Sequence, residues 1–467
     1  MKQKLQNTQR GITLVALIIT IIVLLILAMV SISLVMNSGI INKSKTAVDK
    51  YSQEEVQEQI KLAYSEWQMG QYTGVTDTAA DFIKNKLNSI YGEGAVTSVT
   101  ESSGIFVVKL SNNKQYIYDT KTGGMLDEVP VAAYPNATPG QANNNENTKY
   151  TSNNKTAVIP AGYTVSSVAT EQSIDTGLVI TKGGNEWVWI PVSSSDLAAM
   201  YTQDNTGWTM SGTGVNGIDA VITKYKTNSE IISGKTRVNP GDTSSYREPD
   251  VLNNNSYDKN ATNLSNARLG SNIGEAATKL RDDYKAMIDS VKKYGGFYVG
   301  RYELSSAGTK KNQASLTNTN WYNLYKACKD IDSTGVVTTM IWGCQWDQVC
   351  KFITTAKDAN GDTISLTDSR KYGNYSNSQA PANGGNYSQG NKQNTGSNEA
   401  WKANNIYDIA GNCYEWTQEA NLTYYRAYRG GSYLGNGDGG PVTSRSVNGY
   451  PTNTDFYISS RPTLYIK

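Results

Sequence analysis

The sequence predicts an α+β protein with a long N-terminal transmembrane helix, a small α+β domain and a large loop-rich domain. Three observations lead to this fold class. Residues 12–36 form an uninterrupted apolar run, a helical apolar stripe follows it, and beyond residue 156 short apolar strand-like runs are separated by polar loops. At roughly 150 residues per domain, 467 residues give room for two or three units.

The composition excludes several function classes. The chain has no histidine, so it can hold neither a Ser-His-Asp or Cys-His catalytic group nor a histidine-bound zinc, iron or haem. Its four cysteines, at positions 328, 344, 350 and 413, lack the paired CxxC spacing of zinc knuckles. They are either disulfides or buried thiols, and the sequence leaves that choice open. A net charge of +2 is too small for a general nucleic-acid binder.

The apolar run Ile12–Met36 is long enough to cross a membrane. Its 25 residues make a helix of roughly 37 Å, against a hydrocarbon core of about 30 Å. Lys2, Lys4 and Arg10 precede it without any acidic residue, which places the N-terminus in the cytoplasm and the later domains outside. A cleaved signal peptide is the alternative, but its apolar region usually spans only about 7–15 residues. The sequence therefore predicts a single-pass cell-membrane protein with extracellular C-terminal domains.

The start of this run also carries a processing motif. Gln9-Arg10-Gly11 followed by Ile12-Thr13-Leu14 resembles the signal of type IV prepilins and pseudopilins. The resemblance implies that a prepilin peptidase cleaves between Gly11 and Ile12, that the new N-terminus is methylated, and that other pilins are partners in a surface pilus. That family usually has Glu at the fifth mature position, where this chain has Ala16. The difference favours a minor or tip subunit, or an anchor that never polymerises, over a major subunit.

The next segments are predicted as a stem helix, a small domain and a linker. Apolar residues at offsets 0, 4, 7, 8 and 11 from Val56 form one helical stripe, so residues 12–70 read as one transmembrane and stem helix. Residues 71–128 read as a second helix from Thr78 followed by short strands, a small α+β domain like a pilin head. Residues 129–155 are polar and proline-bearing and read as a linker, and residues 1–11 are the leader.

Residues 156–467 carry five short motifs in a set order: Trp189-Ile190-Pro191, Gly300-Arg301-Tyr302-Glu303, Gly411-Asn412-Cys413-Tyr414-Glu415-Trp416, Arg429-Gly430-Gly431-Ser432-Tyr433 and Ser460-Arg461-Pro462. With these motifs the segment resembles the formylglycine-generating-enzyme-like, or sulfatase-modifying-factor, domain, a variant of the C-type lectin fold. The resemblance implies a loop-rich domain on a modest scaffold of strands.

The residues of this domain argue against the family's known chemistries. Its oxidase members hold copper with two cysteines after the RGGS motif, and no cysteine follows Cys413 here. Its sulfoxide-synthase relatives bind iron through histidines, which the chain lacks. The prediction is therefore a protein that is not an enzyme and has no copper, iron or haem. The alternative is a carboxylate-based enzyme using Asp408, Glu415 or Glu303, but these residues lie in motifs that the family uses for structure.

Asn412 and Glu415 are the candidate metal ligands. They match positions that help to bind a structural calcium ion in some relatives, and oxygen-only ligation suits Ca²⁺. The alternative to calcium binding, which the sequence supports equally, is that Asn412 caps a turn and Glu415 bonds to the backbone.

The tail of the chain is the candidate ligand-binding surface. Tyr, Asn, Ser, Gly and Asp dominate it, which is the composition of binding loops that combine rigid aromatic contacts with adaptable hydrogen bonds. The alternative is a solvated surface without a partner, whose composition reflects only AT-rich coding. Such coding would raise the number of Phe residues as well as of Tyr residues, yet the chain has 31 Tyr against 5 Phe. The segment also resembles the hypervariable part of retroelement-diversified proteins that use this fold. The predicted ligand-binding residues are Tyr433, Asn436, Asp438, Ser444, Ser446, Asn448, Tyr450, Asn453, Asp455 and Tyr457.

Taken together, these observations predict a type IV pilin-like surface protein that displays a non-catalytic adhesion domain. The sequence does not identify the ligand, which is a protein or a glycan. No nucleic acid is expected as a partner. A membrane-tethered carboxylate enzyme and a purely structural filament subunit are the alternatives.

Overall fold

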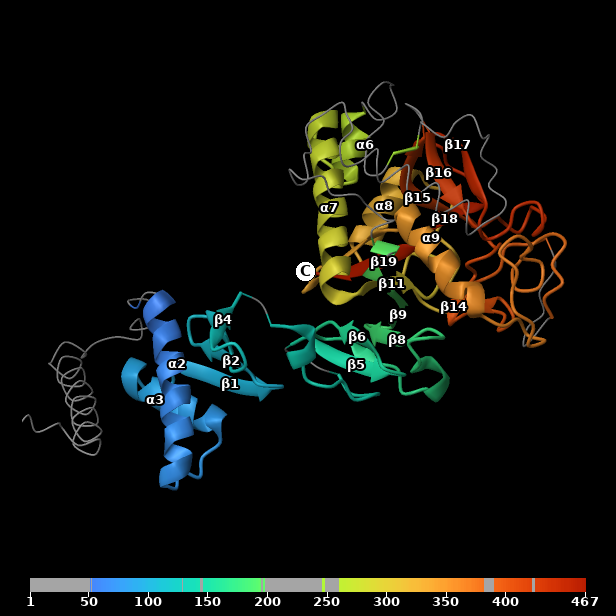
Figure 1. Cartoon of the computed structure of the whole chain (residues 1–467). Helices are drawn as coiled ribbons and strands as arrows, with labels where there is room; N and C mark the ends of the chain where they lie inside the picture. The colour runs from blue at the N-terminus through green and yellow to red at the C-terminus, as the bar shows by residue number, and fades with distance from the viewer. Residues whose placement is uncertain are drawn as a thin grey trace, which may run out of the picture. The chain divides into compact units, whose positions relative to one another are not determined.

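The structure is a computed structural model, and it divides the chain into two compact units that meet between Val129 and Pro130 (Figure 1). It describes residues 51, 53–127, 129–142, 146–194, 196–197, 246–247, 260–381, 390–421 and 425–467. The predicted leader, the apolar run Ile12–Met36 and the cleavage position Gly11–Ile12 lie outside the described residues.

The N-terminal unit packs two helices on a small antiparallel sheet of strand order β1-β2-β3-β4. Its elements are α2 (Gln53–Gly70), η2 (Gln71–Thr73), α3 (Ala79–Tyr91), β1 (Val96–Ser102), β2 (Ile105–Leu110), β3 (Gln115–Asp119) and β4 (Gly124–Leu126). The predicted stripe is confirmed over α2, where Val56, Ile60 and Ala63 are buried. Thr78 caps α3 by accepting a hydrogen bond from the backbone N–H of Asp81 at 3.1 Å.

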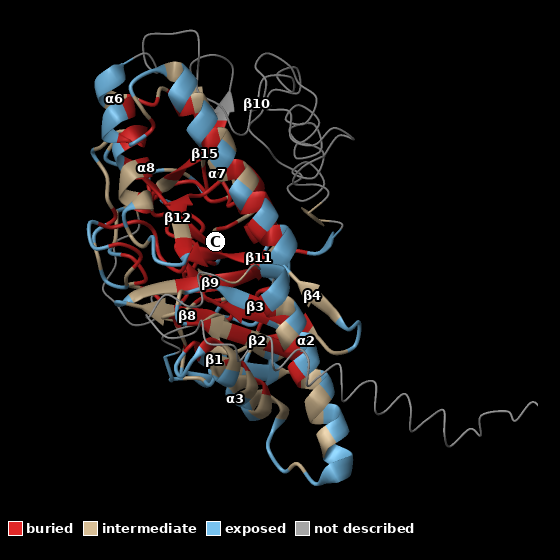
Figure 2. Cartoon of the chain, turned by 90° about the vertical axis from the view of Figure 1, so that its left-hand side faces the viewer, coloured by how far each residue is buried: buried red, intermediate tan, exposed pale blue. Residues whose placement is uncertain are grey.

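A six-stranded sheet forms the centre of the C-terminal unit, in the order β12-β19-β11-β9-β8-β7. Its strands are β7 (Thr164–Val165), β8 (Val179–Lys182), β9 (Asn185–Pro191), β11 (Gly296–Gly300), β12 (Val336–Met340) and β19 (Pro462–Ile466). Alternate residues of β9 belong to different cores: Val188 and Ile190 join one buried cluster, Trp187 and Trp189 another. Both faces of the sheet are therefore covered: β11 is buried along its length, and β9 is buried from Trp187 to Ile190 (Figure 2).

The helices of this unit are α6 (Ala261–Asn266), α7 (Ile273–Tyr294), α8 (Trp321–Lys329) and α9 (Gly343–Phe352), with short 3-10 turns η3 (Val131–Ala133), η4 (Ala169–Glu171) and η6 (Ile353–Thr355). The longest, α7, starts at a cap in which the side chain of Asn272 accepts from Glu275 N at 3.0 Å. It ends at Gly295, whose φ of 78° gives the left-handed turn that glycine adopts without strain.

A five-stranded sheet lies near the end of the chain, with β10-β15-β16-β17 as its path and β18 pairing in parallel with β15. Its strands are β10 (Tyr246–Arg247), β15 (Tyr414–Asn421), β16 (Tyr425–Arg429), β17 (Arg445–Gly449) and β18 (Ile458–Ser460). Two small hairpins complete the unit, β5 (Thr148–Ser152) with β6 (Lys155–Ile159), and β13 (Lys402–Ala403) with β14 (Ile406–Tyr407). Part of the segment predicted as a linker, 129–155, thus forms η3 and β5 of this unit.

The predicted fold class, α+β with a transmembrane or pilin helix and a loop-rich domain on sparse strands, is wrong. The described residues form a mixed α/β structure with five sheets, and strands rather than irregular loops build its scaffold. Among these residues no helix is both long and apolar enough to cross a membrane. The same finding overturns the predicted localisation, a single-pass membrane protein with a cytoplasmic N-terminus. Strands were underestimated because strands buried on both faces lack the polar alternation that identifies a strand in sequence.

The four cysteines are free thiols, and all of them are buried.

Candidate functional site

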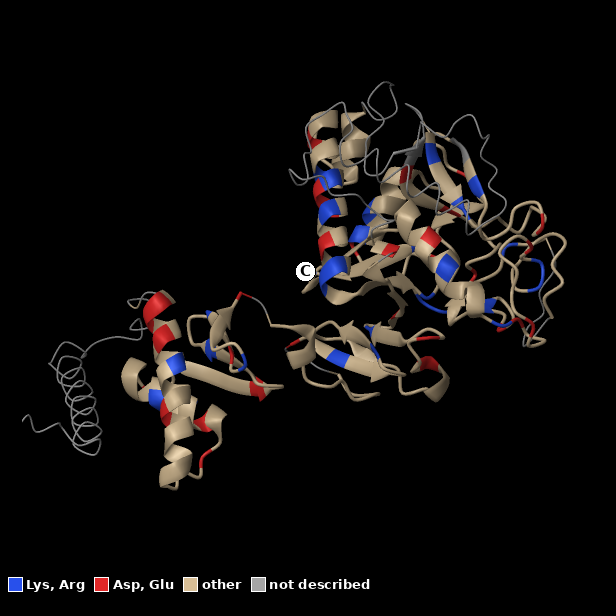
Figure 3. Ribbon diagram, viewed as in Figure 1, with Lys and Arg blue, Asp and Glu red and all other residues tan. Residues whose placement is uncertain are grey.

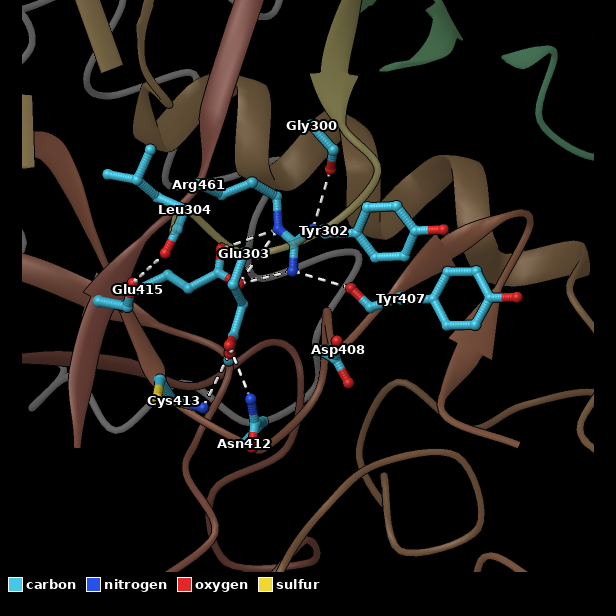
Figure 4. Close-up of polar contacts among 12 residues, drawn as sticks. Gly300, Tyr302, Glu303, Leu304, Tyr407, Asp408, Asn412, Cys413, Glu415 and Arg461 are labelled. Atoms are coloured by element: carbon cyan, nitrogen blue, oxygen red, sulfur yellow. Dashed lines mark hydrogen bonds and ion pairs between the residues drawn. The ribbon is translucent and has the colours of Figure 1, made fainter. Parts of the chain in front are cut away.

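The sequence motifs of the C-terminal unit meet in a buried acid cluster, which consists of Glu303, Asp408, Glu415 and Arg461 (Figure 4). Glu303 follows β11, Asp408 follows β14, Glu415 belongs to β15, and Arg461 separates β18 from β19. None of the four is more than 1% exposed. Segments more than a hundred residues apart in sequence are therefore joined by these side chains.

Arg461 is the central cation of the cluster. Its Nε donates to both carboxylate oxygens of Glu415, at 3.1 and 2.9 Å, and its Nη2 donates to Oε1 of the same residue at 2.6 Å. The remaining donors reach the backbone oxygens of Gly300 and Tyr407, each at 2.9 Å. One guanidinium thus ties β15 to the ends of β11 and β14, with the two-pronged geometry that makes arginine–carboxylate pairs strong.

Glu303 holds the turn that precedes β15. Its carboxylate accepts from the side-chain amide of Asn412 at 2.7 Å, from the backbone N–H of Cys413 at 2.8 Å, and from the hydroxyl of Ser315. Asn412 sits at a φ of 54°, a left-handed conformation that asparagine tolerates better than most residues. The candidate ligand Asn412 therefore acts here as a turn residue.

The candidate calcium ligands Asn412 and Glu415 do not share an open position. The amide oxygen of Asn412 accepts from Asn374 Nδ2 and from Gln393 N, each at 3.0 Å, and both oxygens of Glu415 accept from Arg461. The described residues also hold no group of three or more Cys, Asp or Glu side chains that could bind a metal ion. Because these oxygens are already engaged, the pair does not fit a shared calcium ion, and we assign it no metal chemistry.

Three carboxyl groups share this one arginine, which changes their acidity. Burial raises the pKa of Glu415 to about 8. Burial, followed by the nearby charge of Glu303, raises the pKa of Asp408, and burial raises that of Glu303. Asp408 Oδ2 accepts from Gly396 N at 2.7 Å, while its Oδ1 has no hydrogen-bond partner among the described residues. Asp408 is therefore the carboxyl group of the cluster whose charged form has the least hydrogen-bond support.

A general acid or nucleophile must contact its substrate, and these carboxyl groups are closed to solvent. Asp408, Glu415 and Glu303 instead connect strands and turns. The arrangement is suited to holding the domain together.

The five-stranded sheet presents two chemically different faces. Across β15, β16 and β17, Glu415 pairs with Arg429 and Arg429 with Arg445, so these three side chains lie on one face. On this ionic face Arg429 Nη2 contacts Asp347 Oδ1 at 2.8 Å, and Arg445 Nε contacts Glu419 Oε1 at 3.3 Å, all fully buried.

The opposite face of the sheet carries aromatic side chains. Trp416 pairs with Tyr428 across β15 and β16, Tyr428 pairs with Ser446 of β17, and Tyr414 lies two residues before Trp416. Neighbouring rings are in edge contact, with centroids 5.1 Å apart for Trp416–Tyr428, 4.9 Å for Tyr414–Tyr428, 6.3 Å for Tyr414–Tyr457 and 5.2 Å for Phe456–Tyr457. We call Tyr414, Trp416, Tyr428, Phe456 and Tyr457 the aromatic face.

The aromatic face runs from the core to solvent. Trp416 is 1% exposed, Tyr414, Tyr428 and Tyr457 are partly buried, and Phe456 is 51% exposed. The rings at the exposed end, Phe456 and Tyr457, are thus supported by the more buried rings that they contact. A ligand contacting this end would meet aromatic surface that has little rotamer freedom left to lose.

The structure brings only part of the predicted ligand-binding set to this face. Tyr457 belongs to it, and Ser446 lies opposite Tyr428. Asp455 and the exposed Asn453 lie in the loop just before Tyr457, and Tyr450 contacts Tyr425 with ring centroids 5.0 Å apart.

The other predicted residues lie elsewhere or inside the unit. Tyr433 and Ser444 are buried, at 7% and 1% exposure. The side-chain oxygen of Asn436 accepts from the hydroxyl of Ser376 at 2.9 Å, and Asp438 accepts from Asn377 at 3.2 Å, so both residues attach their loop to residues 370–377. The side chain of Asn448 lies outside the described residues.

Sequence reasoning missed Tyr414, Tyr428 and Phe456. A signal existed for the first of them, because Tyr414 and Trp416 alternate along one strand. Tyr428 could be added only once the register of β15 with β16 was known.

Comparisons with known proteins add little to this description. No protein-family model matches the chain, and no curated protein matches it. Among solved structures, Treponema denticola variable protein 1 is similar at 15% sequence identity, over 37% of this chain and 85% of that chain, with a TM-score of 0.27. At that score the likeness carries no argument about fold or function.

Proposed function

We propose that the chain is a pilin-like display protein whose C-terminal unit binds a ligand at the aromatic face and catalyses no reaction. The observation that carries this proposal is the graded series of rings from buried Trp416 to exposed Phe456. Tyrosine and other aromatic side chains supply large contact areas at low entropic cost, and they dominate the energetic centres of many binding surfaces.

The absence of catalysis is supported by the acid cluster and by the sequence. The carboxyl groups of the motifs are buried and engaged, and the chain contains no histidine and no cysteine after Cys413. Motifs such as 411–416 and 429–433 resemble those of the sulfatase-modifying-factor domain. The resemblance supports the same proposal, because the chain has the framework motifs of that family without the residues of its known chemistries.

A binding screen with the full chain tests the main proposal. We expect a saturable hit on an array of glycans and proteins, and mass spectrometry should recover the bound ligand unchanged. Replacing Phe456 and Tyr457 together by Ala should weaken that hit about tenfold or more, because aromatic anchors carry much of such binding energy. Tyr72→Ala is the matched control, since Tyr72 is an aromatic residue of the N-terminal unit with 93% exposure. A hit that survives the double substitution, or a ligand recovered in altered form, would overturn the proposal.

The pilin-like part of the proposal rests on the motif at Gly11 and Ile12. It is also supported by the N-terminal unit, in which α2 packs on a small antiparallel sheet through Val56, Ile60 and Ala63. Co-expression with a prepilin peptidase should shorten the chain by its first eleven residues and add a methyl group to Ile12. Intact-mass measurement reads both changes, and an unshortened chain would remove this part while leaving the binding proposal standing.

A further inference from the structure

A carboxylate lies beside the exposed end of the aromatic face. Asp455 directly precedes Phe456 and Tyr457 in the loop between β17 and β18, and its side chain is partly buried. Burial raises the pKa of Tyr457, and the charge of Asp455 adds to this shift, so the carboxylate is close to the tyrosine side chain. The exposed end of the aromatic face therefore combines aromatic rings with a negative charge.

Nothing within the described residues neutralises this charge. The carboxylate of Asp455 forms neither an ion pair nor a hydrogen bond with any of them, and none of their Lys or Arg side chains lies over the ring of Phe456 or Tyr457. Lys392, a cation attached to the neighbouring loop, donates to the hydroxyl of Thr317 at 2.8 Å and makes no ion pair with Asp455. In the part of the chain that the structure describes, the carboxylate thus remains available to a cation from outside.

The loop that carries Asp455 is held in place through its backbone. Three of its carbonyl groups accept from backbone N–H groups outside the loop: Pro451 from Trp321 at 3.0 Å, Asp455 from Asn318 at 2.9 Å, and Tyr457 from Tyr414 at 2.9 Å. Because the backbone is fixed, the side chains of Asp455 and Phe456 meet a ligand without the loop first having to be ordered.

The C-terminal unit already contains two combinations of an aromatic ring, a carboxylate and an arginine. Arg301 Nη2 lies 2.6 Å from Glu171 Oε1, and the guanidinium carbon lies 5.3 Å from the ring centroid of Tyr407. Arg429 of the ionic face, which is also ion-paired, lies over the ring of Trp346 at 5.8 Å. A guanidinium group is planar and weakly hydrated, so it stacks on a ring while its N–H groups reach a carboxylate. The exposed end of the aromatic face offers the same two partners.

We propose that the ligand of the aromatic face is a protein that presents an arginine side chain to it. This inference rests on the proposed function and specifies the chemistry of the ligand: the guanidinium group pairs with Asp455 and stacks on the ring of Phe456. A lysine ammonium group is more strongly hydrated and does not stack, and a neutral glycan would leave the carboxylate unpaired. Both therefore fit this surface less well than arginine does.

Calorimetric titration of the full chain with three peptides tests the proposal. One peptide has four repeats of Gly-Ser-Arg, and the other two carry lysine or citrulline in place of arginine; citrulline keeps the planar end group and lacks the charge. We expect the arginine peptide to bind saturably and the citrulline peptide to bind about tenfold more weakly or worse, since it loses the charge-assisted hydrogen bonds. The lysine peptide should lie between them. An arginine peptide that does not bind, or binds no more tightly than either of the others, would overturn the assignment.

A substitution then locates the contact. Asp455→Asn should weaken binding of the arginine peptide about tenfold and leave that of the citrulline peptide unchanged, because only the pairing of opposite charges is lost. Asp282→Asn is the matched control, an exposed carboxylate of α7, a helix that carries charges of both signs along its length (Figure 3). A preference for arginine that survives Asp455→Asn, or that disappears in the control, contradicts the proposed contact.

Failure of this inference and failure of the proposed function have different outcomes in the binding screen. A ligand that depends on Phe456 and Tyr457 but is a glycan would overturn the arginine contact and leave the aromatic face as a binding surface. A screen that yields no ligand dependent on these two residues would overturn both.

Discussion

The two faces of the five-stranded sheet start from alternate residues of the same strands, yet they have different roles; the loop residues Phe456 and Tyr457 extend the aromatic face. On the ionic face, Arg429 and Arg445 are buried with Asp347 and Glu419. On the aromatic face, the rings lead from Trp416 out to Phe456. A buried ion pair costs desolvation and tolerates little change, while a half-exposed ring costs little to replace. The comparison teaches that both sides of a strand can support the fold, while only the exposed end of the aromatic face, at Phe456, is free to vary.

Breaking the ionic face should have the largest effect. Arg429→Met removes the cation 2.8 Å from Asp347 and leaves that buried carboxylate with only the more distant Arg445, at 3.7 Å. We expect a loss of about 3–5 kcal/mol in the free energy of unfolding, measured by denaturant titration. Adding Asp347→Leu should restore much of this loss, because no uncompensated charge then remains. A single variant as stable as the original chain would show that the pair is not structural.

A methyl group at Gly449 tests how the aromatic face is supported. A Cβ at this residue of β17 would lie 2.1 Å from the Trp416 ring, closer than atoms can approach. Gly449→Ala should therefore cost about 1–3 kcal/mol and displace Trp416, which tryptophan fluorescence reports. Gly439→Ala is the control, since its nearest neighbour would be an ordinary 3.7 Å away. Unchanged fluorescence would mean that Trp416 does not support the face.

The pH dependence of the unfolding free energy tests the acid cluster. The pKa of Glu415 is raised from 4.5 to about 8 by burial, so the folded state binds more protons than the unfolded state. Its stabilising contribution is complete below about pH 4.5 and is lost as the pH rises to about 8. Asp408, whose pKa is also raised, adds to this slope, and Asp408→Asn should flatten it in denaturant titrations across that range.

A control of opposite sign is available for this measurement. The pKa of Glu399 is lowered to about 2; burial opposes this shift, and hydrogen bonds from Lys311 and Tyr407 produce it. Its contribution is present above pH 4.5 and is lost as the pH falls towards 2. Glu399→Gln should therefore change only the acid side of the profile. A slope that Asp408→Asn leaves intact would place the titrating proton elsewhere.

Phe456→Ala should have the smallest effect on stability. The side chain is 51% exposed, so the unfolding free energy should change by about 0.5 kcal/mol or less. Binding of the ligand found in the screen should nevertheless weaken, which separates the role of this face from that of the ionic face. A large loss of stability would instead make the exposed ring a structural element.

The sequence was informative where structure is local. The stripe beginning at Val56 and the helix start near Thr78 describe single helices, and both are found in the structure. Motif order brought Glu303, Asp408, Asn412 and Glu415 to attention, but the pairing of Glu415 with Arg461 depends on the parallel contact of β15 with β18. The aromatic face likewise depends on strand register. Pairings of this kind leave no periodic trace in a single chain.

The buried thiols have a practical consequence for following motion in this protein. Burial raises the pKa of Cys350 to about 12, and burial also raises the pKa of Cys328 and Cys413. Since the thiolate is the reactive form, each thiol does not react with alkylating reagents until the surrounding structure opens locally. These cysteines lie in α9, in α8 and in the turn before β15. The labelling rate of each cysteine, measured by peptide mass spectrometry, therefore reports how fast that region of the domain opens.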